Sequence, residues 1–150
     1  MNEENLLHLS NHLCFSIYAG SREMIKLYTP LLKEIKLTYP QYLVMIVLWD
    51  QNIITFKKLG EELYLDSGTL TPVLKRLDEA GLITRKRSEK DERMVIITIT
   101  EKGLDLKEQV KRIPLKIFEK TGLTIEKFNE LNNNVRELIS NLKNNNVKLK

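Results

Sequence analysis

The 150-residue sequence has a single cysteine and no long hydrophobic run, and each absence excludes a class of protein. Cys14 has no second cysteine to pair with inside the chain, which argues against a secreted disulfide scaffold and favours a reducing compartment. The longest apolar run, residues 42–49, is far shorter than the roughly 20 residues that span a bilayer. Charged residues near the start interrupt any signal-peptide pattern. The sequence therefore predicts a soluble, cytoplasmic protein without a membrane partner.

Recognisable catalytic and cofactor motifs are also missing. We find no glycine-rich phosphate loop, no paired catalytic carboxylates and no serine–histidine arrangement. His8 and His12 are four residues apart and can share a helix face, but no glutamate follows His8 and Cys14 lies off that face. The sequence therefore predicts neither an enzyme nor a bound metal or cofactor.

Length and charge are compatible with one nucleic-acid-binding domain. The chain has the length of one ordinary domain, and 42% of its residues are hydrophobic, which is enough for a core without a metal or disulfide. Lys and Arg number 24 against 20 Asp and Glu. The resulting net charge of +4 permits a polyanionic partner without requiring one. Because neither a repeat nor a linker divides the sequence, we expect a single domain over residues 1–150.

The first third of the chain predicts two helices. Apolar residues recur at intervals of three, four or seven over residues 6–35, so we expect one long helix there. Gly20 lies in its interior, where glycine costs roughly 0.5–1 kcal/mol relative to alanine, and close approach of another backbone would explain it. Thr38 and Gln41 form a predicted capping box. The helix that follows runs to about Trp49 and is apolar on all sides, as expected at the centre of a core.

The central part predicts two shorter helices. Thr55 can cap a helix over residues 56–63. Asp66 or the next residue can cap a second helix, which Gly81 ends. Pro72 is awkward inside that helix and predicts an irregular first turn.

The remaining sequence predicts a β-hairpin and two further helices. Segments rich in β-branched residues lie on both sides of a polar tip at residues 88–92, so we expect a two-stranded wing. Thr100 can cap a fifth helix, whose ends Gly103 and Pro114 weaken. Thr124 can start a sixth helix, and we expect the Asn- and Lys-rich tail after it to fray.

Two short helices followed by a basic hairpin are the layout of a winged helix-turn-helix. The second helix fits a DNA major groove, its N-terminus offers N–H groups to a phosphate, and the hairpin tip can reach the neighbouring minor groove. Residues 85–93 contain five basic residues against three acidic ones, which favours contact with DNA. The alternative is a solvated hairpin that contacts no partner.

Several motifs resemble those of MarR-family repressors. The resemblance rests on residues 65–77 (LDSGTLTPVLKRL), 81–85 (GLITR), 91–93 (DER) and 99–103 (ITEKG). Three upstream motifs resemble the one-cysteine, organic-hydroperoxide-sensing (OhrR-type) branch of that family, and they are HLCF at 12–15, YAGSREM at 18–24 and LTYPQY at 37–42. After Gly103 only the helical pattern is similar.

The resemblance implies a mainly α-helical homodimer with a small β-wing, which reads a pseudo-palindromic operator in double-stranded DNA. It implies dimerisation helices at residues 1–38 and 101–150 and a winged helix-turn-helix at 39–100. In the wing, Arg93 would enter the minor groove and Asp91 would hold it. Together with the basic residues of the helix and the wing, the predicted DNA-binding residues are Asp66, Ser67, Thr69, Thr71, Lys75, Arg76, Arg85, Lys86, Arg87, Asp91 and Arg93.

The resemblance also implies that Cys14 is the peroxide sensor, with Tyr28 and Tyr39 hydrogen-bonding the thiol across the dimer and Tyr18 nearby. Spacing supports the arrangement between subunits, because 14 residues of one helix place Cys14 roughly 21 Å from Tyr28. Phenolic donors would favour the reactive thiolate. We expect little help from the helix dipole, because Cys14 lies beyond the first turn of a helix that begins near residue 6. The alternative is an inert core thiol, since free cysteine is among the most buried residue types.

We therefore predict a DNA-binding repressor that releases its operator when an organic hydroperoxide oxidises Cys14. The product would be a sulfenic acid, with which a low-molecular-weight thiol or a backbone nitrogen condenses. Three alternatives stay open. They are a MarR-type repressor released by a small apolar or phenolic ligand, a one-cysteine thiol peroxidase, and a protein that coats chromosomal DNA without sequence preference.

Overall fold

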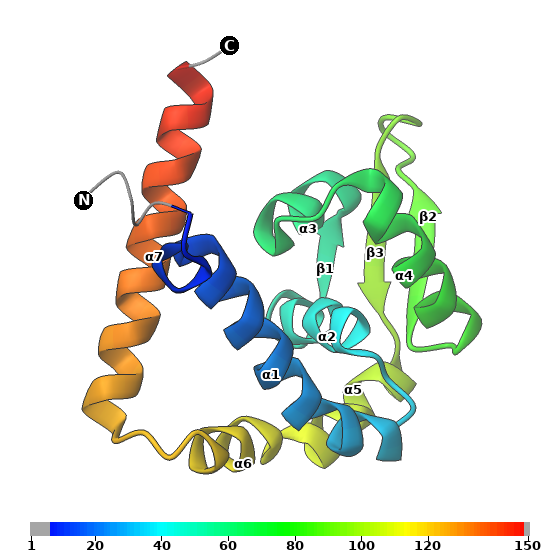
Figure 1. The fold of residues 1–150 in the computed structure, drawn as a ribbon. Coiled ribbons are helices and arrows are strands. Elements are labelled where there is room, and N and C mark those ends of the chain that lie inside the picture. The colour runs from blue at the N-terminus through cyan, green and yellow to red at the C-terminus, as the bar shows by residue number, and fades with distance from the viewer. Residues whose placement is uncertain (1–6, 149–150) are drawn as a thin grey trace. The chain divides into compact units, whose positions relative to one another are not determined.

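The computed structural model describes residues 7–148, and the chain divides into two units, Met1–Ile113 and Pro114–Lys150. Most helices and strands belong to the first unit. Helix α6 (Ile113–Lys120) begins at the last residue of the first unit, and helix α7 (Ile125–Lys148) lies in the second unit. The mainly α-helical fold with a small β-wing is confirmed, whereas the single domain stays a prediction. The elements are a 3-10 turn (Leu9–Asn11), α1 (Leu13–Glu34), α2 (Tyr39–Gln51), β1 (Ile53–Thr55), α3 (Phe56–Leu63), α4 (Ser67–Glu79), β2 (Ile83–Arg87), β3 (Val95–Ile99), α5 (Glu101–Val110), α6 (Ile113–Lys120) and α7 (Ile125–Lys148) (Figure 1).

Helix α1 begins later than the periodicity predicts. The 3-10 turn ends at Asn11, and the next residue, His12, has an extended backbone (φ −89°, ψ 102°) that separates the turn from α1. The predicted start at Leu6 lies outside the described residues. The predicted close approach at Gly20 is wrong within the described part of the chain, because nothing lies within 4 Å of where its Cβ would be.

Helix α2 has the predicted cap and forms much of the core. The Thr38 N–H donates to the Gln41 side-chain oxygen at 2.7 Å, and the capping box is confirmed. The expectation of burial on all sides is wrong at Ile46, whose side chain is exposed. The buried residues of this helix are Gln41, Tyr42, Val44, Met45, Leu48 and Trp49.

Helices α3 and α4 form the predicted helix-turn-helix. Thr55 accepts a hydrogen bond from the Lys58 N–H at 3.2 Å, and Asp66 accepts one from the Thr69 N–H at 2.9 Å, so both caps are confirmed. The irregular first turn predicted from Pro72 is wrong, because α4 runs unbroken from Ser67. Pro72 is the sixth residue of α4 and is exposed, so water can satisfy the carbonyl group that its missing N–H leaves free.

The turn between these helices requires a glycine in α3. The Leu65 N–H donates to the Gly60 carbonyl at 3.0 Å, which draws the chain tightly over the helix. A Cβ at Gly60 would lie 2.9 Å from the Leu65 carbonyl oxygen. Real Cβ atoms almost never approach another atom so closely, so an added methyl group must displace the turn.

We therefore expect Gly60→Ala to lower the free energy of unfolding by about 1–3 kcal/mol, the usual cost of overpacking. Glu61→Ala is the matched control, because it introduces the same side chain at the next position of α3, which is exposed. We expect that variant to stay within about 0.5 kcal/mol of the parent chain. Urea unfolding monitored by circular dichroism measures both, and equal stability of the two variants would show that the turn has room for a side chain.

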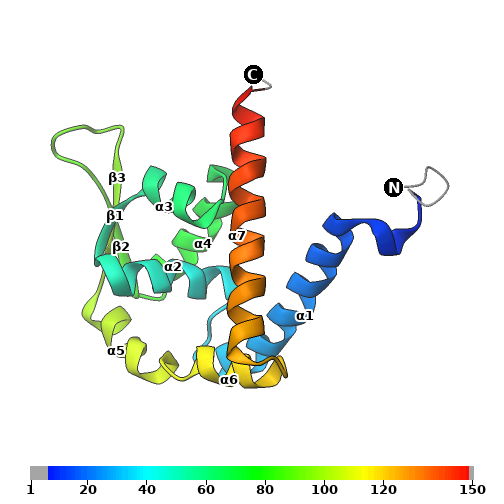
Figure 2. The ribbon, with the colours of Figure 1, turned by 90° about the vertical axis from the view of Figure 1, so that its left-hand side faces the viewer.

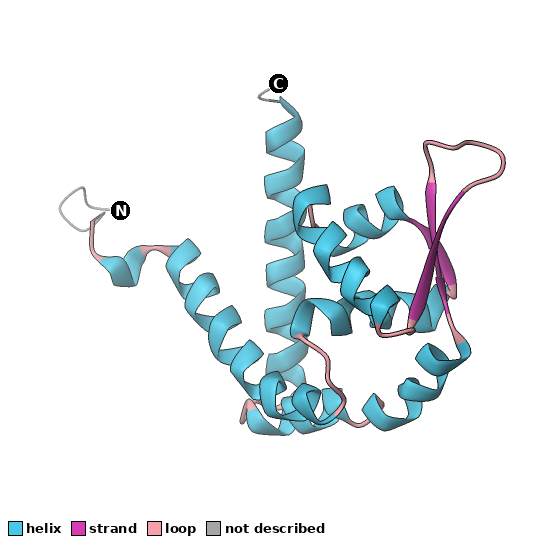
Figure 3. Ribbon diagram, turned by 90° about the vertical axis from the view of Figure 1, so that its right-hand side faces the viewer, coloured by secondary structure: helices cyan, strands magenta, loops and turns pink. Residues whose placement is uncertain are grey.

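The wing is a three-stranded antiparallel sheet in the order β1-β3-β2. Ile97 on β3 pairs with Ile54 of β1 and with Arg85 of β2. The hairpin of β2 and β3 is confirmed, but the sequence interpretation missed β1. The tip that joins the two long strands projects away from the helices of its unit (Figures 2 and 3). It is closed by hydrogen bonds from the Ser88 N–H to the Met94 carbonyl and from the Lys90 N–H to the Ser88 hydroxyl.

The last helices differ from the prediction in three ways. Gly103 does not weaken α5, because a Cβ there would lie 2.3 Å from the Leu82 carbonyl oxygen, so glycine is what permits this packing. The predicted fifth helix is two helices, and Pro114 is the second residue of α6. The expected fraying of the tail is wrong as far as Lys148, where α7 ends. The caps at Thr100 and Thr124 are as predicted.

Candidate thiol site and DNA-binding surface

Cys14 lies at the start of α1 and is exposed. It is the second residue of the helix, so the prediction that it lies beyond the first turn is wrong. The reason is the extended backbone at His12, which delays the start of α1. The free N–H groups and the positive end of the helix dipole are therefore close to the sulfur. The alternative of a buried, inert thiol does not fit the exposure of Cys14 in the single chain.

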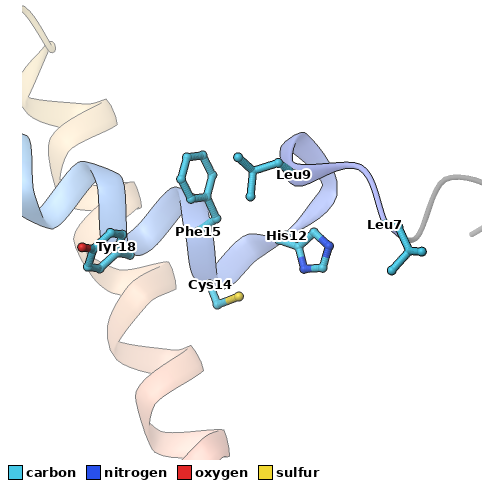
Figure 4. A pocket seen from close by; sticks show the side chains of 6 residues that line it. All are labelled: Leu7, Leu9, His12, Cys14, Phe15 and Tyr18. Carbon is cyan, nitrogen blue, oxygen red and sulfur yellow. The ribbon is translucent and has the colours of Figure 1, made fainter.

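An open groove, mostly apolar in its lining, surrounds the thiol. Figure 4 shows the Cys14 sulfur on the side that faces His12, whereas the Tyr18 hydroxyl points the other way. Two apolar residues of this region are largely exposed, Leu13 at 60% and Leu9 at 59%. The groove is lined by Leu7, Leu9, His12, Cys14, Phe15 and Tyr18.

Tyr18 shares the groove with Cys14, as the resemblance implies, but its hydroxyl has another partner. The Arg22 guanidinium donates to the Tyr18 oxygen at 2.9 Å, and its central carbon lies 5.5 Å from the centre of the tyrosine ring. Both contacts join residues four positions apart on α1, where side chains are neighbours. Tyr18 is thus oriented along the helix by Arg22 in the single chain.

Tyr28 and Tyr39 are brought together by the packing of α1 on α2. Their ring centres are 4.9 Å apart. Burial raises the pKa of Tyr28, and Tyr39 adds to the rise; burial also raises the pKa of Tyr39. Both phenols therefore keep their O–H donors at neutral pH. Cys14 and Tyr28 both lie on α1, and the separation of roughly 21 Å along that helix keeps them apart within one chain.

Tyr42 belongs to the same aromatic cluster, and the sequence interpretation missed it. Its ring centre lies 5.8 Å from that of Tyr28. Burial raises the pKa of Tyr42 to about 12, with Tyr28 and Tyr39 contributing. The spacing could have predicted this, because Tyr42 follows Tyr39 by three residues and both rings therefore lie on one face of α2.

The first turn of α4 combines a cap with exposed hydroxyl groups. Asp66 accepts from the Thr69 N–H and hydroxyl at 2.9 and 3.0 Å, and these bonds hold the pKa of Asp66 below its usual value. The Thr71 hydroxyl donates to the Ser67 carbonyl at 2.6 Å. All four residues are exposed. Asp66 therefore orders the helix start, while the threonine oxygens keep lone pairs that can accept further hydrogen bonds.

Basic residues are also exposed on α4 and on the preceding helix. Lys75 forms a 3.8 Å ion pair with Glu79, and Arg76 is exposed. The sequence interpretation did not single out Lys57 and Lys58, which are exposed in the first turn of α3. Their position could have identified them, because they lie in the first helix of a helix-turn-helix, which crosses the DNA backbone in such folds.

The wing separates its basic residues into two groups. Arg85 donates to Asp78 of α4 at 3.1 Å, so it ties the hairpin to the helix. Lys86, Arg87 and Arg93 are exposed. Asp91 contacts Arg93 through the backbone, because its carboxylate accepts from the Arg93 N–H at 2.9 Å. That bond holds the backbone of the turn, but it does not fix the position of the Arg93 guanidinium.

Two negative findings apply to the part of the chain that the structure describes. No group of three or more His, Cys, Asp or Glu side chains in that part is arranged to hold a metal ion. His8 and His12 do not share a helix face, because they flank the 3-10 turn on opposite sides. None of the helices between residues 7 and 148 is both long and apolar enough to cross a membrane.

Comparisons with known proteins agree with this architecture. The family described as transcriptional regulator SarA/Rot matches residues 26–110. The organic hydroperoxide resistance transcriptional regulator of Bacillus subtilis is 50% identical over 141 residues, which cover 94% of this chain and 96% of that protein. The HTH-type transcriptional regulator SarZ of Staphylococcus aureus is 41% identical over 133 residues, covering 89% and 90%. Reduced AbfR of Staphylococcus epidermidis, solved bound to DNA, is 38% identical with a TM-score of 0.80, covering 96% and 98%.

The fold and these matches together define a winged-helix transcriptional regulator. The chain belongs to the MarR family, in the group that includes the organic hydroperoxide resistance regulators and the SarA/Rot regulators. The family resemblance seen in the sequence motifs is thereby confirmed.

Proposed function

We propose that this protein is a cytoplasmic, DNA-binding repressor that senses organic hydroperoxides through Cys14 and then releases its operator. The observation that carries the proposal is the exposed thiol at the start of α1, in a mostly apolar groove, in a chain that also carries a winged helix with an exposed basic surface. An apolar lining suits the hydrocarbon part of an organic hydroperoxide. No enzymatic turnover is part of the proposal.

The chemistry needs one thiolate and one hydroperoxide. The Cys14 sulfur attacks the terminal oxygen of ROOH, the S–O bond forms, the O–O bond breaks, and the alkoxide leaves as ROH after taking up a proton. The sulfur is oxidised to a sulfenic acid and the peroxide is reduced to an alcohol. Because the chain has no second cysteine, a low-molecular-weight thiol condenses with the sulfenic acid, releases water and leaves a mixed disulfide.

A homodimer completes the proposed sensor. Within one chain Tyr28 cannot reach Cys14, so the phenols of one subunit would meet the thiol of the other. Each unit, taken by itself, carries exposed apolar side chains of the kind that subunit interfaces cover. On the first unit these include Leu9, Leu13, Phe15, Ile17 and Tyr18, and on the second Leu115, Ile125, Leu131 and Leu142.

The proposed DNA contacts divide by groove. The exposed face of α4, with Ser67, Thr69, Thr71 and Arg76, would enter the major groove, and Arg93 at the wing tip would enter the minor groove. Lys75, Lys86 and Arg87 would contact phosphates, as would Lys57 and Lys58 on α3. Asp66, Asp91 and Arg85 would support this surface through the cap, the tip turn and the ion pair described above. Two such surfaces in a dimer fit a pseudo-palindromic operator.

A gel-shift assay with a duplex from the region upstream of the protein's own gene tests the proposal. We expect the reduced protein to shift the duplex and cumene hydroperoxide with a small thiol to abolish the shift. A shift that is equal for scrambled DNA would instead favour a protein that coats DNA without sequence preference. Catalytic consumption of the peroxide with a thiol reductant, without any shift, would favour a peroxidase.

The sensor tyrosines lead to a further prediction. Tyr28→Phe and Tyr39→Phe each keep the ring but remove a phenolic donor that would stabilise the thiolate of the partner subunit, so we expect slower sulfenic acid formation. Mass spectrometry of the Cys14 peptide after timed exposure to cumene hydroperoxide measures the rate. Tyr64→Phe, in the turn after α3, is the control and should react at the parent rate. Unchanged rates in both sensor variants would rule out the proposed hydrogen bonds.

A further inference from the structure

Four aromatic rings form a continuous row within the first unit. The ring centres are 4.9 Å apart for Tyr39 and Tyr28, 5.8 Å for Tyr28 and Tyr42, and 6.1 Å for Tyr42 and Trp49. Each separation lies in the range of roughly 4.5–7 Å at which aromatic rings attract each other. Tyr28 comes from α1, and the other three rings come from one face of α2. We call these four residues the aromatic ladder.

One end of the ladder is fixed to the base of the wing. The Trp49 indole N–H donates to the Gly103 carbonyl at 2.8 Å, and the Lys107 ammonium donates to the Trp49 carbonyl at 2.9 Å. Gly103 packs so tightly that a Cβ would lie 2.3 Å from the Leu82 carbonyl oxygen. Leu82 directly precedes β2. The Trp49 ring is therefore hydrogen-bonded to the first turn of α5, which packs closely against the residue before β2.

The Tyr42–Trp49 half of the ladder is buried and has little room to absorb a displacement, whereas Tyr28 and Tyr39 are half-buried. Tyr42 is 3% exposed and Trp49 is 8% exposed, and close-packed interiors have low compressibility and transmit strain. Tyr28 and Tyr39 lie close enough to Tyr42 to add to the rise of its pKa. Tyr28 thus contacts both Tyr39 and Tyr42, and Tyr42 contacts Trp49.

We propose that Tyr42 and Trp49 are positioning residues that carry the oxidation signal from Tyr28 and Tyr39 to the base of the wing. The inference rests on the proposed function, in which oxidised Cys14 of one subunit displaces the sensor tyrosines of the other. The displaced rings move Trp49, and its hydrogen bond to Gly103 moves the start of α5 together with the wing. Breaking the ladder should therefore separate the chemistry at Cys14 from the release of DNA.

Trp49→Phe is the main test, because it keeps an aromatic ring and removes the indole N–H that donates to Gly103. Tyr42→Leu interrupts the ladder, and Tyr42→Phe is its matched control, which keeps the ring. For each protein the Kd for a fluorescent duplex from the upstream region is measured reduced and after treatment with cumene hydroperoxide and a small thiol. The rate of Cys14 oxidation is measured in parallel by mass spectrometry.

We expect Trp49→Phe to oxidise at the parent rate while the ratio of oxidised to reduced Kd falls about tenfold, within the usual range of coupling between sites. Tyr42→Leu should lower that ratio as well. Tyr42→Phe should keep the parent ratio. A purely structural role would weaken DNA binding equally in the reduced and the oxidised protein and leave the ratio of their Kd values unchanged. That result in Trp49→Phe would overturn the proposal even if Tyr42→Leu fails to fold. A parent protein that keeps its duplex after oxidation would instead reject the proposed function itself, and this inference with it.

Discussion

Cys14→Ser is expected to bind the operator as tightly as the parent protein and to keep it after hydroperoxide is added. A serine hydroxyl has nearly the volume of the thiol and can accept the same hydrogen bonds, but it is not a nucleophile toward peroxides. Because Cys14 is exposed at the start of α1 and is the only cysteine in the sequence, no other thiol can take its place. Fluorescence anisotropy of the labelled duplex, read before and after cumene hydroperoxide, measures the effect.

Ser16→Ala is the matched control for this variant. Ser16 is exposed on the same turn of α1, two residues beyond the thiol, and its loss should leave both DNA binding and release unchanged. Release of Cys14→Ser by the oxidant would show that another group, such as a methionine, is the sensor. Loss of DNA binding in the untreated Cys14→Ser protein would show instead that the thiol has a structural role.

Arg93→Ala is expected to weaken operator binding by about 1–3 kcal/mol, which is roughly 5- to 150-fold in Kd. Arg93 is exposed at a wing tip that projects away from the helices, and its backbone is held by the Asp91 carboxylate. Losing one cationic contact to DNA should also reduce the slope of log K against log salt by about one. Titrations of one duplex at several salt concentrations give both quantities.

Lys90→Ala removes the same charge from the same tip and is the matched control. We expect a smaller loss of affinity for it, because a cation outside the minor groove acts only through the general field of the wing. Thr69→Ala and Thr71→Ala should behave differently from both, relaxing the preference for the operator over other sequences. Equal affinities and equal salt slopes for Arg93→Ala and the parent protein would mean that the wing is a solvated loop.

The caps and the helix-turn-helix were predictable because their chemistry is local. Thr38 with Gln41, Thr55, Asp66 and Thr100 each satisfy free N–H groups within a few residues, and this leaves a clear pattern in the sequence. Gly81, with φ at +70°, ends α4 for an equally local reason. Most of the fold around the candidate DNA surface could therefore be predicted without a structure.

The elements that were missed depend on contacts distant in the sequence. Strand β1 has three residues, too few to show an alternating pattern, and it exists because it pairs with β3. Gly103 was misjudged because its need for glycine comes from the Leu82 carbonyl, which approaches from another segment. The start of α1 was misplaced because apolar residues continue with the helical period through the 3-10 turn and the extended His12.

The sequence predicted which residues belong to the candidate site better than it predicted the contacts those residues make. The motifs indicated Cys14, Tyr28 and Tyr39, but not that Tyr42 joins the tyrosine cluster. They likewise placed Arg85 in the basic wing without its ion pair to Asp78 on α4. Such pairs form only when separate elements pack together, so the sequence pattern carries little information about them.

The most direct test of the account is a titration of DNA release against the oxidation of Cys14. The parent protein, bound to a labelled duplex from the upstream region, receives increasing amounts of cumene hydroperoxide below one equivalent, with a small thiol present. Anisotropy gives the fraction of duplex released, and mass spectrometry gives the fraction of Cys14 converted to sulfenic acid or mixed disulfide. We predict that the two fractions rise together, whereas complete modification of Cys14 with the duplex still fully bound would contradict the account.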